Sequence, residues 1–248
     1  AVENLAALEG DPGFAFRELD VSLPFDVDGP LDAIYHMASP ASPRDFSRIP
    51  VEIMQVGSFG TYHVMELAVR KRCPVLVAST SEVYGDPELS PQSETYHGNV
   101  NPIGPRSCYD EAKRFMEAMT KVYQRFRGVD VRIVRIFNTY GPRMGLDDGR
   151  ALPNFLTQAL AGEPLTVYGD GSQTRSFCFV DDLVDGLVRL MASGETDPVN
   201  IGNPHEMTIL EFARTILDAT GSTSGVRHLP ALVNDPQQRR PDITRART

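Results

Sequence analysis

A tyrosine and a lysine four residues apart, Tyr109 and Lys113 in SCYDEAKRF, have the residue types and the spacing for a proton transfer. Positions i and i+4 of a helix lie on one face, so the phenol and the ammonium group would be neighbours. The reference pKa of a tyrosine hydroxyl is about 10, and a nearby ammonium group lowers it by favouring the phenolate. The pair could then take the proton of an alcohol whose carbon loses a hydride. The same spacing also occurs on solvated helices, so other parts of the chain have to support this interpretation.

A second group of polar side chains ends an apolar run. Residues 73–80, CPVLVAST, are expected to form a buried strand, and Thr80, Ser81 and Glu82 follow at its end. Ligands of open parallel sheets bind at the carboxyl ends of the strands. A long Pro-rich loop, 84–107, comes next, and loops of this length in compact domains are usually functional. We therefore expect the strand end and the tyrosine–lysine helix to form one site.

Strands and helices are expected to alternate along the first part of the chain, which is typical of a parallel, doubly wound α/β sheet. The expected strands are 14–22, 31–39, 73–80 and 129–141, and the expected helices are 51–71 and 109–127. Beyond Gly141 we expect a second, smaller domain interleaved with the end of the first. Its elements are a strand pair around a Gly-Asp-Gly turn at 164–180, helices at 154–163, 181–194 and 208–220, and a strand at 198–203. Thr208 is the expected N-cap of the last helix.

The net charge of −9 argues against a nucleic-acid-binding protein or a basic membrane-surface protein. No apolar run reaches the roughly 20 residues that a membrane span needs, and no signal peptide is recognised. The three cysteines, Cys73, Cys108 and Cys178, form neither a CxxC motif nor a cluster with histidines. We therefore expect reduced thiols in a cytoplasmic protein that has no metal site and no nucleic-acid or membrane partner.

Six motifs, in order along the chain, resemble those of the extended short-chain dehydrogenase/reductase family. They are VASTSEVYGDP, NPIGPRSCYDEAKR, RIFNTYGPRM, PLTVYGDGSQTR, VNIGNP and DPQQRRPDI. The chain looks most like the UDP-glucuronate decarboxylase (UDP-xylose synthase) branch of that family. The resemblance implies a Rossmann-like NAD domain at 1–141, to which 176–203 returns, and a nucleotide-sugar-binding domain at 142–175 and 204–248. It also implies NAD as cofactor, a UDP-sugar as substrate, and a homodimer formed through the helices at 51–71 and 109–127.

One triplet favours this branch over its relatives. The dTDP-glucose 4,6-dehydratases of the family carry Thr-Asp-Glu, where the aspartic acid protonates a departing C6 hydroxyl, whereas this chain has Thr80-Ser81-Glu82. A serine hydroxyl cannot replace that acid. A uronic acid needs no departing hydroxyl, because oxidation at C4 makes a β-keto acid whose C6 carboxylate can leave as CO2. Hydride then returns to C4, and the expected reaction converts UDP-glucuronate to UDP-xylose.

The resemblance also implies roles for individual residues. Tyr109 takes the proton of the C4 hydroxyl, Lys113 tunes it and holds the nicotinamide ribose, and Thr80 hydrogen-bonds the C4 oxygen. Glu82 and Arg175 border C5 and the carboxylate, and the resemblance does not decide which of them manages the C5 proton. The implied substrate-binding residues are Ser81, Asn138, Arg150, Tyr168, Arg175 and Arg240. The implied cofactor-binding residues are Asp20, Val21, Met37, Ala38, Ser39, Ala78, Tyr109, Lys113 and Thr139.

The sequence departs from the family pattern in two places. The family begins with a strand, a glycine-rich turn and a helix that hold the NAD diphosphate, but no G-x-x-G-x-x-G precedes Asp20. We therefore expect the sequence to be a fragment that lacks on the order of 30–40 residues, one strand–helix–strand unit, at its start. The family also shows an asparagine where Gly57 stands, a lysine near Gln55, and often a leucine at the position of Met37.

Three other functions remain open from the sequence. A decarboxylase could stop at the 4-keto pentose and release NADH. The chain could act like a dTDP-glucose 4,6-dehydratase. It could also be a non-catalytic nucleotide-sugar-binding relative, although an intact Thr80, Tyr109 and Lys113 argue against that function, because binding alone needs no tuned phenol.

Overall fold

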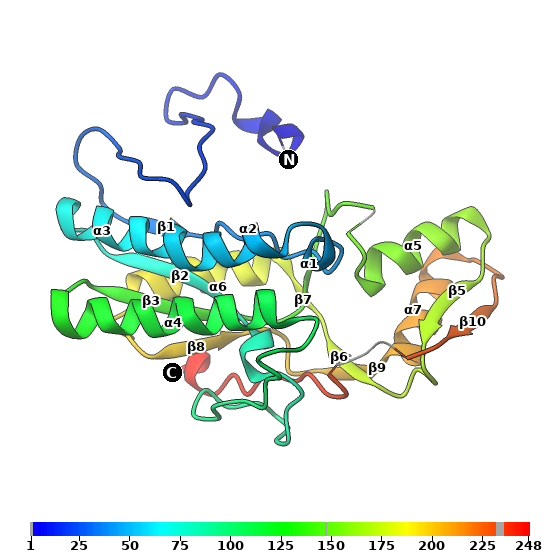
Figure 1. Cartoon of the computed structure of the whole chain (residues 1–248). Coiled ribbons are helices and arrows are strands. Elements are labelled where there is room, and N and C mark those ends of the chain that lie inside the picture. The colour runs from blue at the N-terminus through cyan, green and yellow to red at the C-terminus, as the bar shows by residue number, and fades with distance from the viewer. Residues whose placement is uncertain (1, 147, 232–235) are drawn as a thin grey trace.

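Four parallel strands form the main sheet of the computed structural model, which describes residues 2–146, 148–231 and 236–248. In their order across the sheet the strands are β1 (Ile34–His36), β2 (Val75–Thr80), β3 (Val131–Ile136) and β8 (Pro198–Ile201). Each neighbouring pair is parallel, and helices cover both faces of the sheet (Figure 1). The expected doubly wound α/β fold is confirmed.

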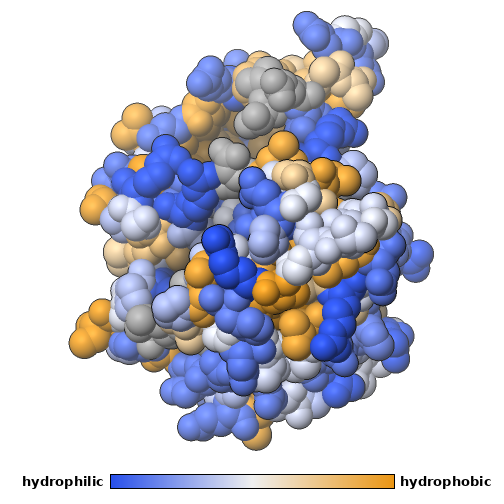
Figure 2. Space-filling view, turned by 90° about the vertical axis from the view of Figure 1, so that its right-hand side faces the viewer, coloured by the Kyte–Doolittle hydropathy of each residue, from blue (hydrophilic) through white to orange (hydrophobic). Residues whose placement is uncertain are grey.

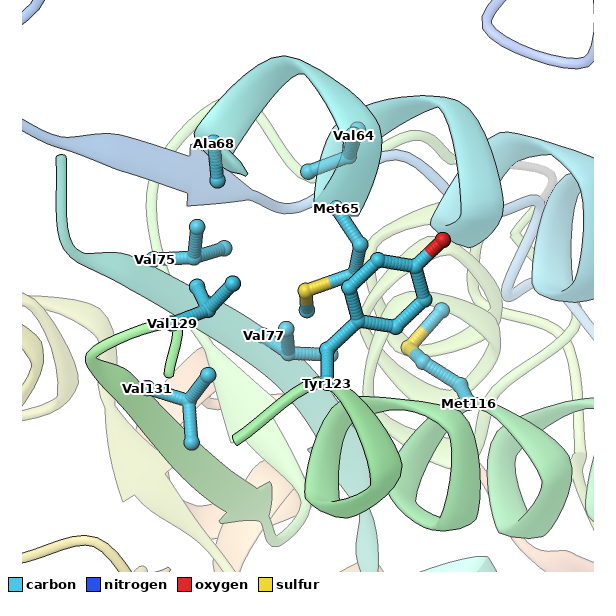
Figure 3. Close-up of a cluster of buried hydrophobic side chains, with 9 residues drawn as sticks. All are labelled: Val64, Met65, Ala68, Val75, Val77, Met116, Tyr123, Val129 and Val131. Carbon is cyan, nitrogen blue, oxygen red and sulfur yellow. The ribbon is translucent and has the colours of Figure 1, made fainter. Parts of the chain in front are cut away.

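Alternating side chains of β2 and β3 supply the two halves of the core, because successive strand residues point to opposite faces. On one face the strands pack against α3 (Thr61–Lys71) and α4 (Ser107–Arg127), and Figure 3 shows the valines of β2 meeting Met65, Met116 and Tyr123 there. On the other face they pack against the leucines of α6 (Val180–Ala192). Burial on both faces fixes the position of the carboxyl ends of the strands, where the polar residues lie.

The helix expected at 51–71 is present, with a π-helical turn in its middle. It consists of α2 (Pro50–Gln55), η2 (Val56–Gly60) and α3, and it packs against α4. A Cβ atom placed on Gly57 would lie 2.7 Å from the Cβ of Ala112 and 3.0 Å from its carbonyl oxygen. The two helices therefore approach too closely for a side chain at Gly57, which accounts for the glycine in place of the expected asparagine.

We expect Gly57→Ala to lower the free energy of unfolding by about 1–3 kcal/mol, because α4 has to move to relieve the overlap. Alanine's better helix propensity offsets at most about 1 kcal/mol of this loss. Denaturant unfolding of Gly57→Ala, Ala112→Gly and the double variant measures the coupling between the two positions. Gly194→Ala is the control, since its Cβ would meet nothing within 4 Å. Additive effects in the double variant would contradict the contact.

A smaller lobe lies at one end of the sheet (Figure 1). Its core contains apolar side chains of α5 (Ala151–Ala161), β5 (Leu165–Tyr168) and α7 (Ile209–Thr220). Thr208 caps α7 as expected and forms a capping box with Glu211: its hydroxyl oxygen accepts from the Glu211 backbone N–H, and the Glu211 carboxylate accepts from the Thr208 backbone N–H. The lobe is thus built by two segments that are far apart in the sequence.

Two expectations about strands were wrong. Residues 14–22 form no strand and are largely exposed, because the alternating pattern has no neighbouring strand to bond with. The two strands expected around the Gly-Asp-Gly turn do not pair with each other: β5 pairs with β10 (Val226–Leu229), and β6 (Thr174–Ser176) pairs with β9 (Glu206–Thr208). The remaining short elements are η1 (Val2–Leu8), α1 (Asp45–Arg48), η3 (Ser81–Tyr84), β4 (Thr139–Tyr140), β7 (Cys178–Phe179) and η4 (Arg245–Arg247).

Candidate active site

A cavity of about 350 Å³ opens at the carboxyl ends of β2 and β3, against α5 of the smaller lobe. It brings together most of the residues expected to act on the substrate or the nicotinamide. These are Met37, Ser39, Ala78, Thr80, Ser81, Glu82, Tyr109, Lys113, Asn138, Thr139, Arg150, Tyr168 and Arg175. They come from seven separate stretches of the chain, so the fold assembles one site from motifs that the sequence shows only in linear order.

Tyr109 and Lys113 lie in the first two turns of α4, as their spacing predicted. The Tyr109 ring stacks on Phe46 with 4.9 Å between ring centroids, and its hydroxyl hydrogen-bonds Thr80 at the end of β2. The Lys113 ammonium group lies 5.7 Å from the centroid of the Tyr109 ring and donates to the carbonyl oxygen of Ala78 at 2.7 Å. Both side chains are buried and held in place, so the phenol and the ammonium group are neighbours.

The acidity of Tyr109 differs from the expectation. Burial, followed by the charge of Glu82, raises the pKa of Tyr109 to about 12, although the Thr80 hydrogen bond and Arg150 act in the opposite direction. Burial also lowers the pKa of Lys113 to about 8, against the raising effect of Glu117. The expected net lowering of the Tyr109 pKa is therefore wrong, because burial outweighs the effect of the nearby ammonium group.

Glu82 is the centre of a buried cluster of charges beside Tyr109. One of its carboxylate oxygens accepts from Arg106 at 2.7 Å and the other pairs with Arg239 at 2.7 Å. Burial raises the pKa of Glu82, but the charges of Arg239, Arg106 and Arg175 outweigh that effect and lower it to about 2. Glu82 is thus an ionised carboxylate that faces the cavity, and it cannot serve as a proton store near neutral pH.

Two of these arginines were missed by the sequence analysis. Arg106 directly precedes α4, within a motif that had been recognised, and Arg239 is the neighbour of the expected Arg240. The structure corrects the choice within that pair: Arg239 is buried and borders the cavity, whereas Arg240 is exposed and bonds Gln92 through its backbone. Successive residues of an extended segment point in opposite directions, so only one of the pair can face inward. Asp235, the first residue of this motif, lies outside the described residues.

Arg239 keeps one donor free for a ligand. It is 7% exposed, and its Nη1 atom bonds Glu82 and the side-chain oxygen of Asn138, the latter at 3.3 Å. Its Nη2 atom is buried and has no hydrogen-bond partner among the residues that the structure describes. A buried guanidinium donor without a partner is costly, and a carboxylate of a ligand would satisfy it. The cluster therefore offers a binding point for an anionic group.

Behind the site, Glu117 links the lysine helix to the sheet. It lies one turn beyond Lys113 on α4, accepts from the Ser79 hydroxyl at 2.6 Å, and forms two hydrogen bonds with Arg135 of β3 at 2.9 and 2.7 Å. Arg135 also donates to the hydroxyl of Tyr84, which bonds the buried Asn200. This network fixes the position of the helix that carries Lys113 relative to the strand ends.

We expect Glu117→Gln to lower the pKa of Lys113 further below about 8, because the negative charge of Glu117 raises that pKa. The variant should also lose about 3 kcal/mol of unfolding free energy, since the Arg135 guanidinium is left buried without its carboxylate. NMR titration of ¹³Cε-labelled lysine and denaturant unfolding measure the two effects. Asp185→Asn, which breaks a surface pair with Arg189, is the control and should change neither by a comparable amount. An unchanged Lys113 pKa would contradict the prediction.

A second hollow collects the residues expected to hold the far end of the cofactor. Asp20 and Val21 border it together with Ala38 and Ser39, and Ser39 also borders the main cavity. Because Ser39 borders both, the two hollows adjoin each other, as a bound dinucleotide would require. The Asp20 carboxylate is exposed and already accepts two hydrogen bonds from Ser22, which lower its pKa.

Three expected substrate residues and the expected cofactor residue Thr139 also line the cavity. Arg150, at the start of α5, donates to the carbonyl oxygen of Ala41 at 2.9 Å and pairs with Asp148. Tyr168 is partly exposed at the end of β5, and Arg175 is buried in β6. Thr139 donates its hydroxyl to the carbonyl oxygen of Phe137 at 2.9 Å.

The chain belongs to the NAD dependent epimerase/dehydratase family, which its residues 15–202 match. Within that family its curated relatives include UDP-glucuronic acid decarboxylase 1 of Danio rerio, 52% identical over 96% of this chain and 56% of the relative. UDP-glucuronic acid decarboxylase 3 of Arabidopsis thaliana is 49% identical over 99% of this chain and 71% of that protein. The resemblance drawn from the motifs is confirmed. The chain spans little more than half the length of the zebrafish protein.

Solved structures of the same family have the same fold. A dTDP-glucose 4,6-dehydratase from Streptomyces venezuelae with NAD bound is 27% identical, with a TM-score of 0.86 over 99% of this chain and 76% of that one. A variant of UDP-glucuronic acid 4-epimerase from Bacillus cereus, in complex with NAD and a fluorinated UDP-glucuronic acid, is 25% identical. Its TM-score is also 0.86, over 99% of this chain and 78% of the epimerase.

Proposed function

We propose that the protein is an NAD-dependent lyase that converts UDP-glucuronate to UDP-xylose and CO2. The observation that carries the proposal is the buried Glu82–Arg106–Arg239 cluster, which borders the same cavity as Tyr109 and Thr80 and contains an Arg239 donor with no partner among the described residues. A carboxylate on the sugar would meet this donor. The names of the relatives and the serine at position 81 support the same reaction.

The tyrosine side of the cavity would carry out the oxidation. NAD+, when bound, would accept a hydride from C4 of the sugar and later give it back. Tyr109 takes the proton of the C4 hydroxyl, and Thr80, its hydrogen-bond partner, keeps the phenol directed at that oxygen. Lys113, held by Ala78, stabilises the phenolate. The pKa of Tyr109 is raised to about 12, and the positive charge of NAD+, when bound, would favour the phenolate.

The arginine side of the cavity would manage the carboxylate. Arg239 binds it through Nη2, and Arg175 adds a second buried positive charge. Once C4 is a ketone, the C5–C6 bond breaks, CO2 leaves, and the electron pair moves into the enolate of the ketone. Protonation of C5 and return of the hydride to C4 then complete the product. Ser81 has no acidic proton to give, which suits a substrate without a leaving hydroxyl at C6.

We assign the nucleotide end of the substrate to the smaller lobe, and thus keep the division into an NAD domain at 1–141 with 176–203 and a sugar-nucleotide domain at 142–175 with 204–248. Tyr168 offers a ring for the uracil, and Arg150 and Asn138 offer donors for the diphosphate. We also propose that the protein works in the cytoplasm, because its three cysteines are buried free thiols, as in a reducing compartment. Among the described residues, none of the helices has the length and apolar character to cross a bilayer.

Incubation with UDP-glucuronate and NAD+ tests the proposed reaction. We expect a mass spectrum of a UDP-pentose, release of CO2 in equal amount, and no lasting rise in absorbance at 340 nm. A lasting rise together with a 4-keto pentose would instead identify an oxidative decarboxylase. Dehydration of dTDP-glucose with UDP-glucuronate untouched would overturn the proposal, as would tight UDP-sugar binding without any turnover.

We further propose that two copies of the chain associate through α2–α3 and α4, which lie side by side (Figure 1). Apolar side chains are exposed there at helical spacing. They are Val51, Met54, Phe59 and Tyr62 on the first helix and Phe115, Val122 and Phe126 on the second. The end of the molecule at the smaller lobe instead shows small apolar groups separated by hydrophilic surface (Figure 2).

The double variant Val122→Asp with Phe126→Asp should therefore sediment as a monomer, because two charges would be buried without partners in the dimer. The matched control places aspartates at Val184 and Val188, which are similarly exposed on α6 at the opposite face of the sheet. Analytical ultracentrifugation compares both variants with the unmodified protein. An unchanged mass of the first variant, or the same change in both, would contradict this interface.

A further inference from the structure

One buried carboxyl group next to the site has no part in the reaction described so far. Asp110 follows Tyr109 in the first turn of α4 and is 6% exposed. Its Oδ1 atom is buried and finds no hydrogen-bond partner among the described residues. A buried carboxylate whose oxygens lack partners lowers the stability of the fold. A carboxyl group in this position is therefore expected to be protonated or to serve a function.

The charged groups around Asp110 belong to the cluster that faces the cavity. They are Glu82 on η3, Arg106 before α4, Arg239 in the C-terminal segment, and Glu111 on α4 itself. Among them Glu82 has the strongest influence on Asp110, and the two arginines act against it. Glu82, Arg106 and Arg239 line the cavity, whereas Asp110 does not. A proton from Asp110 therefore needs a carrier to reach the substrate, and Glu82 is the cavity-lining group that influences Asp110 most strongly.

Decarboxylation, as proposed above, consumes one proton in each turnover. The substrate carboxylate leaves as neutral CO2, and a proton takes its place on C5. The proton that Tyr109 removes from the C4 hydroxyl returns to the C4 oxygen when the ketone is reduced, so it cannot be used at C5. Glu82 is fully ionised, with a pKa of about 2, and the arginines stay charged, so none of them stores a proton at neutral pH.

We propose that Asp110 is the proton store of the site, and this inference rests on the proposed decarboxylation. The Asp110 carboxyl proton moves onto the Glu82 carboxylate as Glu82 delivers a proton to C5 of the enolate, and solvent then restores the proton of Asp110. No electrons are exchanged, and Glu82 ends as the carboxylate that it was at the start. Asp110 thus acts through Glu82, as a positioning and proton-supplying residue that does not touch the sugar.

The acidity of Asp110 suits this role. Burial, followed by the charge of Glu82, raises its pKa to about 7, and Arg106 and Arg239 limit the rise. A group with this pKa is protonated in a large fraction of molecules at neutral pH and regains its proton readily from water. Because the pKa is raised, Asp110 carries its proton below pH 7 and loses it as the pH rises above 7.

Asp110→Asn tests the proposal, because it keeps the shape of the side chain and removes the acidic proton. In a single turnover with UDP-glucuronate, the absorbance at 340 nm should rise at the rate of the unmodified protein, since oxidation at C4 does not involve Asp110. Its decay should be about 100-fold slower, because C5 lacks its proton supply. The loss of turnover above pH 7 should also disappear from the profile of the variant. Asp110→Glu, which retains an acid, should recover part of the decay rate.

Glu111→Gln is the matched control, since Glu111 is the next residue on the same helix, partly exposed and paired with Arg114. NMR titration of ¹³Cγ-labelled aspartate adds a readout that needs no turnover: one resonance should titrate near pH 7 and be missing from Asp110→Asn. Normal decay and an unchanged pH profile in Asp110→Asn would overturn the inference, and so would an Asp110 carboxyl that stays ionised down to pH 5. If the unmodified protein releases no CO2 from UDP-glucuronate, the proposed function itself fails, independently of Asp110.

Discussion

Replacing Tyr109 by phenylalanine is expected to lower kcat for the decarboxylation by about 10²–10⁴-fold, the usual contribution of a positioned acid or base. The variant keeps the aromatic ring and its stack on Phe46, so the helix and the cavity should persist. It loses only the hydroxyl that hydrogen-bonds Thr80, which we propose as the base for the C4 proton. Because C4 oxidation precedes the loss of CO2 in the proposed reaction, the transient signal at 340 nm should disappear together with product formation.

Tyr123→Phe is the control for this experiment. Tyr123 lies on the same helix, and its hydroxyl bonds Glu66 on α3, away from the cavity. This change removes a hydrogen bond of similar kind without touching the site, so it should alter stability but leave kcat within a few-fold of the unmodified value. Full turnover by Tyr109→Phe, in protein that still binds UDP-glucuronate, would exclude Tyr109 as the base.

Arg239→Gln is expected to lower kcat/KM for UDP-glucuronate by about 10²–10³-fold, as for the loss of one partner of a buried charge pair. The variant removes the free Nη2 donor that we assign to the sugar carboxylate, and it leaves Glu82 with Arg106 as its remaining close partner. The pKa of Glu82 should also rise from about 2, because the charge of Arg239 is the first of the influences that lower it.

The adjacent arginine supplies the matched control. Arg240→Gln changes an exposed side chain whose described hydrogen bonds to Gln92 run through the backbone, so kcat/KM should stay within a few-fold of the unmodified value. UDP-glucose, which lacks the carboxylate, separates binding of the sugar acid from general damage: its affinity should be similar in both variants. Equal losses in Arg239→Gln and Arg240→Gln would contradict the assignment of the carboxylate to Arg239.

Local periodicity predicted the parts of the fold that depend on one segment at a time. The helices around Tyr109 and Val64 and the buried strand ending at Thr80 follow directly from the spacing of their apolar residues. Strand pairing could not be predicted in this way, because it depends on which segment lies alongside. The alternating residues 14–22 have no strand beside them, and β5 pairs with β10 rather than with its neighbour in the sequence.

In the candidate site, too, the sequence predicted the features that one segment determines and not those that depend on the whole fold. The i, i+4 spacing correctly placed Tyr109 beside Lys113, since a helix fixes that relation locally. The acidity of Tyr109 was mispredicted because burial is set by the whole fold, and here it outweighs the nearby ammonium group. The choice between Arg239 and Arg240 depends on which side of an extended segment faces the cavity, and Asp110 becomes notable only once its burial is known. The residues next to them in the sequence indicate neither which arginine faces the cavity nor that Asp110 is buried.

The most direct test of the account follows the hydrogen on C4 of the sugar. UDP-glucuronate labelled with deuterium at C4 should yield a UDP-pentose that retains the label at C4, because in the proposed reaction the hydride leaves and returns within the same cavity. The carbon of C6 should appear as CO2 in equal amount. Loss of the C4 label to water, or release of CO2 without transient oxidation at C4, would contradict the reaction that we assign to Tyr109 and its neighbours.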